Sequence, residues 1–310
     1  MFDIARADRS VREAIATTTS PGVIVPASSA NVGPGYDAVG LALDLPLLAT
    51  VEPPQAARVI SFGAGADELP TDETNAVWHG LLTWCERTHQ SIPDVTLHVH
   101  SAIPLEGGLG SSSAALVAGL SIGRMLVGGD VDINELATEL EGHPDNALPA
   151  LLGGIVVKPV HSAPRRFIPR RDLVCVVVHP DERMSTTQAR SALPTHIPLA
   201  DAAANAARCA AVVMGIAGLA PLDPTDFEDV IHQPARFAIM PTSGACVTAL
   251  VNAGIPAFLS GAGPTVAALV STADHPDPQG AVRQVLSDIP GQLDIVSLPM
   301  NTSGTITINV

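Results

Sequence analysis

The stretch PLEGGLGSSSAALVAGL, residues 104–120, places three glycines and three serines directly before an apolar segment of helical composition. A helix N-terminus leaves backbone N–H groups unpaired and carries a partial positive charge, so it attracts anions. Glycines let a phosphate approach the main chain without meeting Cβ atoms, and serine hydroxyls can bond phosphate oxygens or Mg²⁺. The stretch therefore predicts a phosphate-binding turn, with a glycine-rich turn and a serine N-cap as the alternative.

The common phosphate motifs do not match this stretch. Lys158 is the only lysine of the chain, so no G-x-x-x-x-G-K-[ST] motif can be present. The order G-G-L-G-S-S also differs from the dinucleotide motif G-x-G-x-x-G, and the protein-kinase signatures H-R-D and D-F-G are absent. We therefore expect main-chain amides and serine hydroxyls to provide most of the contacts to phosphate.

Composition limits the class of protein. The chain has 310 residues, of which 46% are hydrophobic, enough for two domains. Its formal net charge of -15 disfavours nucleic acid as a partner. The cysteines, Cys85, Cys175, Cys209 and Cys246, are widely spaced, which argues against zinc and against a disulfide framework. The first twenty residues lack the pattern of a secretory signal, and the longest apolar run, 209–222, is short for a membrane span. We expect a cytoplasmic protein that does not bind membranes.

The hydrophobic pattern predicts two α+β domains. We expect residues 1–22 to form a loosely ordered N-terminal extension, 23–168 the first domain and 169–310 the second, with the boundary in the charged connector RRFIPRRD. Strands are predicted at 23–25, 39–45, 58–62, 95–101, 173–180, 256–259, 265–270, 292–298 and 304–309, with a further strand after the glycine pair of 151–160. Helices are predicted at 75–89, 111–126, 132–142, 185–193, 199–219 and 242–254.

Three motifs, in order along the chain, resemble those of the GHMP small-molecule kinases. PLEGGLGSSSAA (104–115) resembles the second motif, P-x-x-x-G-L-G-S-S-A-A, which encloses ATP phosphates, while VPASSANVGPGYDAVGLAL (25–43) and LSGAGPTVAAL (259–269) resemble the others. The resemblance implies a two-domain GHMP kinase fold. Its N-terminal domain would be like ribosomal protein S5 domain 2 and its C-terminal domain ferredoxin-like. It also implies ATP-binding residues: Asn75 in the base pocket, and Pro104, Leu105, Glu106, Gly107, Gly108, Leu109, Gly110, Ser111, Ser112, Ser113 and Ala114 at the phosphates.

The first motif resembles the form found in homoserine kinases, as do LEGHPDNALPALLGG (140–154), STTQARSALP (185–194) and HQPAR (232–236). This resemblance implies Mg²⁺-ATP-dependent transfer of the γ-phosphate to the terminal hydroxyl of L-homoserine, a step of threonine biosynthesis. The products are O-phospho-L-homoserine and ADP. Tyr36 and Ser113 depart from the usual pattern, which has Phe and Ala at these positions.

The chemistry of homoserine fits the candidate residues. A zwitterion needs an anionic partner for its ammonium and donors for its carboxylate. Asp37 can hold the ammonium, and the forked guanidinium groups of Arg190 and Arg236 suit the carboxylate. The remaining substrate candidates are Asn31, which would orient the hydroxyl, Asn146, whose oxygen can bond the amine, and Thr186, one helical turn from Arg190.

The resemblance also implies a metal site. It makes Glu141 the Mg²⁺ carboxylate, paired with the hydroxyl of Ser112, with Ser111 as an adjacent competitor. It assigns no catalytic base, and we do not assign one to Asp145. The expected reaction is direct in-line attack, with Asn31, Ser112 and Glu141 as the catalytic residues, because positioning and charge neutralisation can supply most of the rate of phosphoryl transfer.

Two alternatives remain open at this stage. Another GHMP kinase would act on a different small alcohol, and a non-catalytic relative would bind ligand without turnover. The combination of Asp37 with two arginines disfavours the first, because mevalonate and sugars lack an ammonium. The presence of Glu141 and the serines disfavours the second. Homodimers are common among these kinases, and the sequence leaves a homodimer open.

Overall fold

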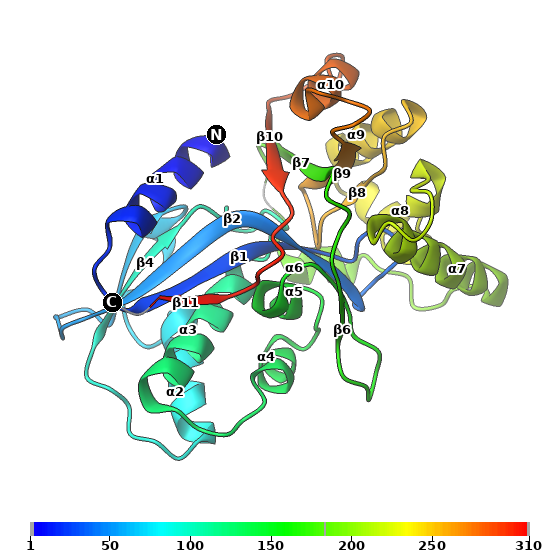
Figure 1. Cartoon of the computed structure of the whole chain (residues 1–310). Coiled ribbons are helices and arrows are strands. Elements are labelled where there is room, and N and C mark those ends of the chain that lie inside the picture. The colour runs from blue at the N-terminus through cyan, green and yellow to red at the C-terminus, as the bar shows by residue number, and fades with distance from the viewer. Residues whose placement is uncertain (1–2, 183, 309–310) are drawn as a thin grey trace.

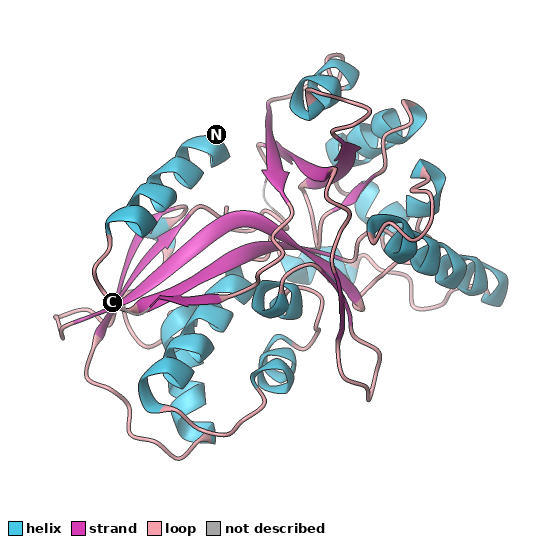
Figure 2. Cartoon of the chain, viewed as in Figure 1, coloured by secondary structure: helices cyan, strands magenta, loops and turns pink. Residues whose placement is uncertain are grey.

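The computed structural model describes residues 3–182 and 184–308, which form two β-sheets with helices packed on them (Figures 1 and 2). The first sheet has seven strands in the order β11-β1-β2-β4-β3, with β5 paired to β2 and β6 paired to β5. Only the pairing of β3 with β4 is parallel among these strands. The strands are β1 (Gly22–Ala30), β2 (Val39–Glu52), β3 (Val59–Gly63), β4 (Thr96–Ser101), β5 (Ile155–Val157), β6 (Arg165–Phe167) and β11 (Ile306–Ile308).

Helices α2 to α5 lie together on one side of this sheet (Figure 1). Glycines allow the two longest of them, α2 and α3, to pack closely: a Cβ on Gly80 would lie 2.5 Å from the Leu116 carbonyl oxygen, and one on Gly119 would lie 2.0 Å from that of Val77. This contact fixes α3, whose first turn faces the candidate site. The bounds are η1 (Ala66–Glu68), α2 (Ala76–Arg87), α3 (Ser111–Val127), α4 (Ile133–Glu141) and α5 (Ala147–Leu152).

An additional helix, α1 (Ile4–Thr17), lies on the opposite side of the long strands (Figure 1). Asp3 caps it by accepting from the Arg6 backbone N–H, and the stripe Ile4, Ala7 and Val11 is buried in the main core. The structure therefore corrects the expectation of a loosely ordered extension. The stripe is narrow and the rest of the helix is charged, so its composition resembles that of a solvated segment although one face is buried.

The second sheet has four strands in the order β10-β7-β9-β8, and all its pairings are antiparallel. Its chain order β-α-β-β-α-β is that of a ferredoxin-like domain, which confirms the expectation for the second half. The strands are β7 (Leu173–Pro180), β8 (Ala257–Leu259), β9 (Val266–Ser271) and β10 (Leu293–Pro299). The helices are α6 (Thr186–Ser191), α7 (Leu199–Ile216), η2 (Pro224–Phe227), α8 (Gln233–Phe237), α9 (Pro241–Asn252) and α10 (Pro278–Val285).

The chain crosses between the two sheets more than once. It passes from the first to the second between β6 and β7, which brackets the boundary expected between residues 168 and 169. It then returns, because β11 pairs with β1 in the first sheet although it lies in the expected second domain. The two sheets are therefore joined by two segments.

Helix α7 is longer than the apolar run 209–222, because it begins at Leu199, where the helix predicted at 199–219 also begins. In the part of the chain that the structure describes, it alone has the length and composition of a membrane-crossing helix, with a mean hydropathy of 1.3 over 18 residues. It nevertheless carries a buried amide: the Asn205 side chain donates to the Pro34 carbonyl at 2.8 Å and accepts from the Val230 N–H at 3.2 Å. The first bond ties α7 to the loop that follows β1, and the second ties it to the segment between η2 and α8.

Candidate active site

The glycine turn lies between β4 and α3, and its shape depends on missing side chains. Gly108 and Gly110 have positive φ angles of 75° and 71°. A Cβ on Gly108 would lie 2.4 Å from the Ser260 carbonyl oxygen, and one on Gly110 would lie 2.1 Å from the Ser28 hydroxyl. Larger residues are therefore excluded by both conformation and space.

The first turn of α3 has no side-chain cap. Its N-cap residue is Gly110, and no side chain accepts from the N–H groups there. The alternative in which a serine caps this helix is thus not what the structure shows. The N–H groups of the first turn, together with the partial positive charge of a 17-residue helix, are available to an anion.

The glycine turn is held by hydrogen bonds from β1 and from the second domain. Ser28 donates its backbone N–H to the Leu109 carbonyl at 3.2 Å, and the Ser260 hydroxyl donates to the Gly108 carbonyl at 2.6 Å. The side chains of Leu109 and Ala114 are buried in the core, so they support the turn and do not line the cavity. The third motif therefore contacts the phosphate turn directly.

The first motif, the third motif and the segment HQPAR (232–236) meet at one carbonyl. The Gly261 oxygen accepts from the Asn31 side-chain amide at 2.9 Å and from the Arg236 guanidinium at 2.8 Å. Asn31 also accepts from the Asp37 backbone N–H at 3.1 Å, which fixes the loop after β1. Both polar groups of Asn31 are thus engaged in positioning the loop, although its side chain still borders the cavity.

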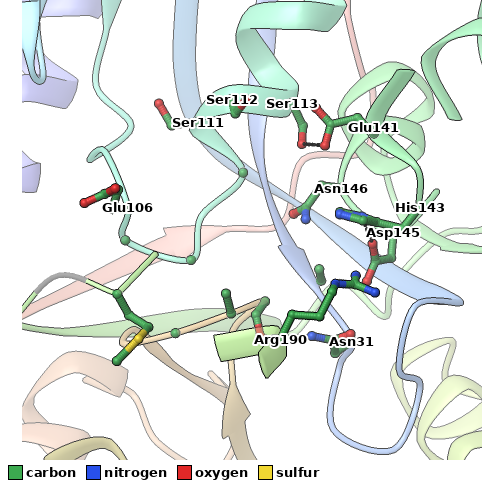
Figure 3. A pocket seen from close by; sticks show the side chains of 18 of the residues that line it. Asn31, Glu106, Ser111, Ser112, Ser113, Glu141, His143, Asp145, Asn146 and Arg190 are labelled. Carbon is green, nitrogen blue, oxygen red and sulfur yellow. Dashed lines mark hydrogen bonds and ion pairs between the residues drawn. The ribbon is translucent and has the colours of Figure 1, made fainter. Parts of the chain in front are cut away.

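A cavity of about 260 Å³ extends over these elements. Its walls come from both domains, and Figure 3 shows the polar side chains that converge on it. It brings together most of the residues predicted from the sequence. The predicted residues among its lining are Asn31, Asp37, Pro104, Glu106, Gly107, Gly108, Gly110, Ser111, Ser112, Ser113, Glu141, Asn146, Arg190 and Arg236.

Glu141 faces the first turn of α3 from the end of α4. Its carboxylate accepts from the Ser113 hydroxyl at 2.7 Å, as the dashed line in Figure 3 marks. Burial raises the pKa of Glu141, and the bond from Ser113 partly opposes that rise. The sequence predicted Ser112 as its partner, with Ser111 as the competitor. The hydroxyl that bonds the carboxylate in the structure is that of Ser113, the residue that departs from the usual family pattern, and Ser112 as the metal ligand stays a prediction.

This arrangement can hold a divalent cation. Mg²⁺ takes few protein ligands and keeps several waters, so one carboxylate and one hydroxyl beside a phosphate site suffice. The Ser113 hydroxyl bonds Oε2 of Glu141, and the other carboxylate oxygen, Oε1, is not used by that bond. The donor set therefore fits Mg²⁺ bound together with phosphate oxygens.

A second cavity of about 340 Å³ adjoins the first and shares Glu106, Ser111 and Ser112 with it. Leu105 and Asn75 lie in its wall, where the resemblance implies a nucleotide base. The Asn75 side chain is already engaged, since it accepts from the Val77 N–H at 3.0 Å and donates to the Pro70 carbonyl at 2.7 Å. Its observed role is to cap α2.

The charged residues predicted to bind the phosphate-accepting substrate, Asp37, Arg190 and Arg236, line the first cavity. Arg190 donates two hydrogen bonds to the Asp37 carboxylate, at 3.2 and 3.1 Å. Arg236 is 3% exposed, and burial lowers its pKa. Asn146 lies nearby, with its side-chain oxygen accepting from the Ser28 hydroxyl at 2.9 Å. The side chain of the sixth predicted residue, Thr186, lies outside the part of the structure that is described.

Several further groups lie at the end of the first cavity that contains Asp37 and Arg190, and no role is predicted for them from the sequence. His143 and Asp145 line the cavity and share a hydrogen bond of 2.9 Å, which raises the pKa of His143. Tyr36 lies beneath both arginines, with the Arg190 and Arg236 guanidinium carbons 5.9 and 5.8 Å from its ring centroid. Two features of the sequence could have indicated these groups: the tripeptide H-P-D at 143–145 and the tyrosine at position 36, where the usual pattern has phenylalanine.

The geometry, an uncapped helix N-terminus beside a pocket with charged side chains, is that of a kinase of small molecules. Comparison with known families agrees: residues 75–154 match the GHMP kinases N terminal domain, and residues 216–290 match the GHMP kinases C terminal. The chain belongs to the GHMP kinases, a family of ATP-dependent small-molecule kinases.

Individual relatives and solved structures give a closer comparison than the family models do. The chain is 38% identical to the homoserine kinase of Leifsonia xyli over 81% of each chain, and 39% identical to that of Clavibacter michiganensis over 84% of this chain and 86% of the other. Among solved structures, a homoserine kinase from Cytophaga hutchinsonii superposes with a TM-score of 0.79 at 27% identity, covering 94% of this chain and 98% of that one. Mevalonate kinase from Methanococcus jannaschii shares the fold, with a TM-score of 0.65 at 14% identity, covering 91% and 99% of the two chains.

Proposed function

We propose that this chain transfers the γ-phosphate of ATP to the terminal hydroxyl of L-homoserine, giving O-phospho-L-homoserine and ADP. One observation carries the proposal: a single cavity joins the uncapped start of α3 to a pocket that contains Asp37, Arg190 and Arg236. The similarity to homoserine kinases over more than four-fifths of the chain supports the same acceptor.

On the nucleotide side, the amides of the glycine turn and of the first turn of α3 would bind the phosphates. Glu141, with the hydroxyl of Ser112 or Ser113, would hold Mg²⁺. The metal supplies neutralisation of the charge that develops on the transferred group. The base would lie in the adjoining apolar cavity beyond Ser111.

On the acceptor side, Asp37 would bind the ammonium of homoserine, and Arg236 with Arg190 its carboxylate. Asn146 retains a lone pair on its oxygen for the amine, and Asn31 would orient the hydroxyl while holding the loop. Thr186 stays a candidate from its position at the start of α6. In this pose the hydroxyl oxygen attacks the γ-phosphorus, the bond to the β-phosphate oxygen breaks, and the proton leaves to phosphate or water.

The proposed reaction uses no dedicated base. Asp145 is the nearest candidate, but one of its carboxylate oxygens is held by His143. Replacing Asp145 with Asn should keep kcat within about tenfold of wild type, whereas the loss of a general base costs about 10²- to 10⁴-fold.

A coupled assay of ADP release tests the proposal directly. Homoserine, serine, threonine and mevalonate are compared as acceptors, and the phosphorylated product is identified by ³¹P NMR. We expect homoserine to give the highest kcat/KM. Asp37→Asn should raise the KM for homoserine strongly and leave the KM for ATP unchanged, because Asp37 is the predicted partner of the ammonium and is not part of the glycine turn.

The matched control is Asp94→Asn, which removes another arginine-paired carboxylate at an exposed position outside both cavities. Preference for mevalonate or another alcohol would favour a different GHMP kinase, and binding of both ligands without turnover would favour a non-catalytic relative. A cytoplasmic location and a homodimer stay predictions, to be checked by fractionation and by light scattering.

A further inference from the structure

The two residues proposed to bind opposite ends of the substrate are paired with each other. Arg190 donates from Nη1 and Nη2 to the two carboxylate oxygens of Asp37, at 3.2 and 3.1 Å. A planar guanidinium facing a carboxylate in this way is a good ion-pair geometry. With the pair closed, Arg190 occupies one acceptor site on each Asp37 oxygen, so a substrate ammonium competes with the guanidinium for this carboxylate.

The two partners differ in how firmly they are held. Asp37 lies in a tight loop, with a positive φ of 52° and its backbone N–H bonded to Asn31. Arg190 reaches the pair through a long side chain from the short helix α6, and it is 46% exposed. The arginine is therefore the partner that can move at low cost.

Arg236 provides the contrast. Its guanidinium is buried and bonds the Gly261 carbonyl and the His232 ring, and among the described residues no carboxylate lies within ion-pairing distance of it. Burial lowers its pKa, as expected for a cation that lacks a close anion. The free pocket thus holds one buried cation that is ready for a carboxylate and one cation that occupies the ammonium site.

Building on the proposed function, we propose that Arg190 acts as an exchangeable substitute for the substrate ammonium, so that a zwitterion binds better than a ligand with an amine alone or a carboxylate alone. The substrate ammonium displaces Arg190 from Asp37, and the released guanidinium joins Arg236 at the substrate carboxylate. A ligand with an amine alone leaves Arg190 unpaired near Arg236. A ligand with a carboxylate alone leaves Asp37 paired and gains only one arginine. The pair therefore selects amino acids over amino alcohols and hydroxy acids.

Three ligands and one substitution test this exchange. L-Homoserine, 3-aminopropan-1-ol, which lacks the carboxylate, and 4-hydroxybutanoate, which lacks the amine, are titrated into wild type and Arg190→Gln. Tyr36 is the only tyrosine of the chain and lies under Arg190, so its ring signals in ¹H–¹³C NMR report both binding and the position of the guanidinium.

We expect Arg190→Gln to weaken homoserine binding but to tighten 3-aminopropan-1-ol by about threefold to fivefold, the effect of freeing one partly exposed ion pair. The gain should disappear in Asp37→Asn/Arg190→Gln. Arg58→Gln, which opens the exposed pair with Asp94, should change none of the affinities. Because Arg190 is half exposed, these variants should fold.

Unchanged or weaker binding of 3-aminopropan-1-ol to Arg190→Gln would overturn the exchange, since an arginine that only contacts the carboxylate predicts that result. A gain that persists without Asp37 would overturn it as well. These outcomes are separate from the proposed function: if wild type phosphorylates homoserine, the kinase assignment stands even when the exchange fails. If wild type does not phosphorylate homoserine, the proposed function itself is wrong, whatever the ligand titrations show.

Discussion

On the nucleotide side of the cavity, Gly108 and Gly110 shape a turn that offers main-chain amides, and the Ser28 N–H and the Ser260 hydroxyl hold it through its carbonyls. On the acceptor side, Asp37 and Arg190 bind each other through side chains that can rearrange. In the proposed reaction, the first surface would recognise its ligand by shape and the second by charge. Substitutions on the two sides should therefore fail in different ways.

The largest effect is expected for Gly108→Ala. The new Cβ would lie 2.4 Å from the Ser260 carbonyl oxygen, so the turn must shift and the phosphate is misplaced. We expect kcat/KM for ATP to fall about 100-fold, the effect of a displacement of about 1 Å at a reacting group. Homoserine binding without nucleotide, measured by calorimetry, should stay near the wild-type value.

Gly128→Ala is the matched control for that substitution. Gly128 has a similar φ of 68°, but a Cβ there would meet no atom within 4 Å. It should lose about 1 to 3 kcal/mol of stability, because φ 68° with ψ -150° is a backbone conformation that essentially only glycine adopts, and ATP turnover should be kept. Equal loss of ATP turnover in both variants would contradict a steric role for Gly108.

Arg236→Lys tests the charged side. Lysine keeps the charge but cannot reproduce the bonds to Gly261 and His232 at 2.8 and 3.0 Å while also reaching a carboxylate. The KM for homoserine should rise about 30-fold, the loss of one charge-assisted hydrogen bond. An equal rise in the KM for ATP would show that the two sides are not separable.

Ser113→Ala should have an intermediate effect at the border between the two sides. It removes the hydroxyl that bonds Glu141 at 2.7 Å, and metal affinity should fall about tenfold, as for other residues that orient a metal ligand. Mn²⁺ binding in the presence of ADP, followed by electron paramagnetic resonance, measures this independently of turnover. Ser121→Ala, a buried serine further along the same helix, is the control. Unchanged Mn²⁺ affinity in Ser113→Ala would remove the positioning role.

The smallest effect on activity is expected for Asn75→Ala. Because both polar groups of Asn75 are used at the start of α2, its loss should cost about 1 kcal/mol of stability and leave the KM for ATP unchanged. Asp132→Ala removes the equivalent cap of α4 and should behave alike in thermal unfolding. If Asn75→Ala raised the KM for ATP markedly and Asp132→Ala did not, Asn75 would be shown to contribute to binding of the nucleotide base.

The main elements of the fold were predictable because their periodicity is strong. Strands β1, β2, β4 and β7 and helices α2, α3 and α7 carry regular apolar patterns, and the sequence predicts each of them. The short helices α5, α8 and α10 lack enough turns to establish a pattern, and α1 carries too narrow a stripe.

The phosphate turn was predictable because adjacent residues form it. The acceptor pocket was not, because its contacts join residues that are far apart in the chain. Asp37 and Arg190 are separated by 153 positions, and Asn31 and Gly261 by 230. Only the family resemblance placed these residues together. Which serine contacts Glu141 depends on the rotation of α3 about its axis, and neighbouring residues on a helix point in different directions.

The return of the chain to the first sheet has a consequence for synthesis on the ribosome. Strand β11 pairs with β1 through Ile306, Thr307 and Ile308, so the N-terminal half cannot complete its hydrogen bonding until these residues have been translated. A nascent chain would expose the β1 edge until then, and a stop codon before position 306 would leave an open template for aggregation.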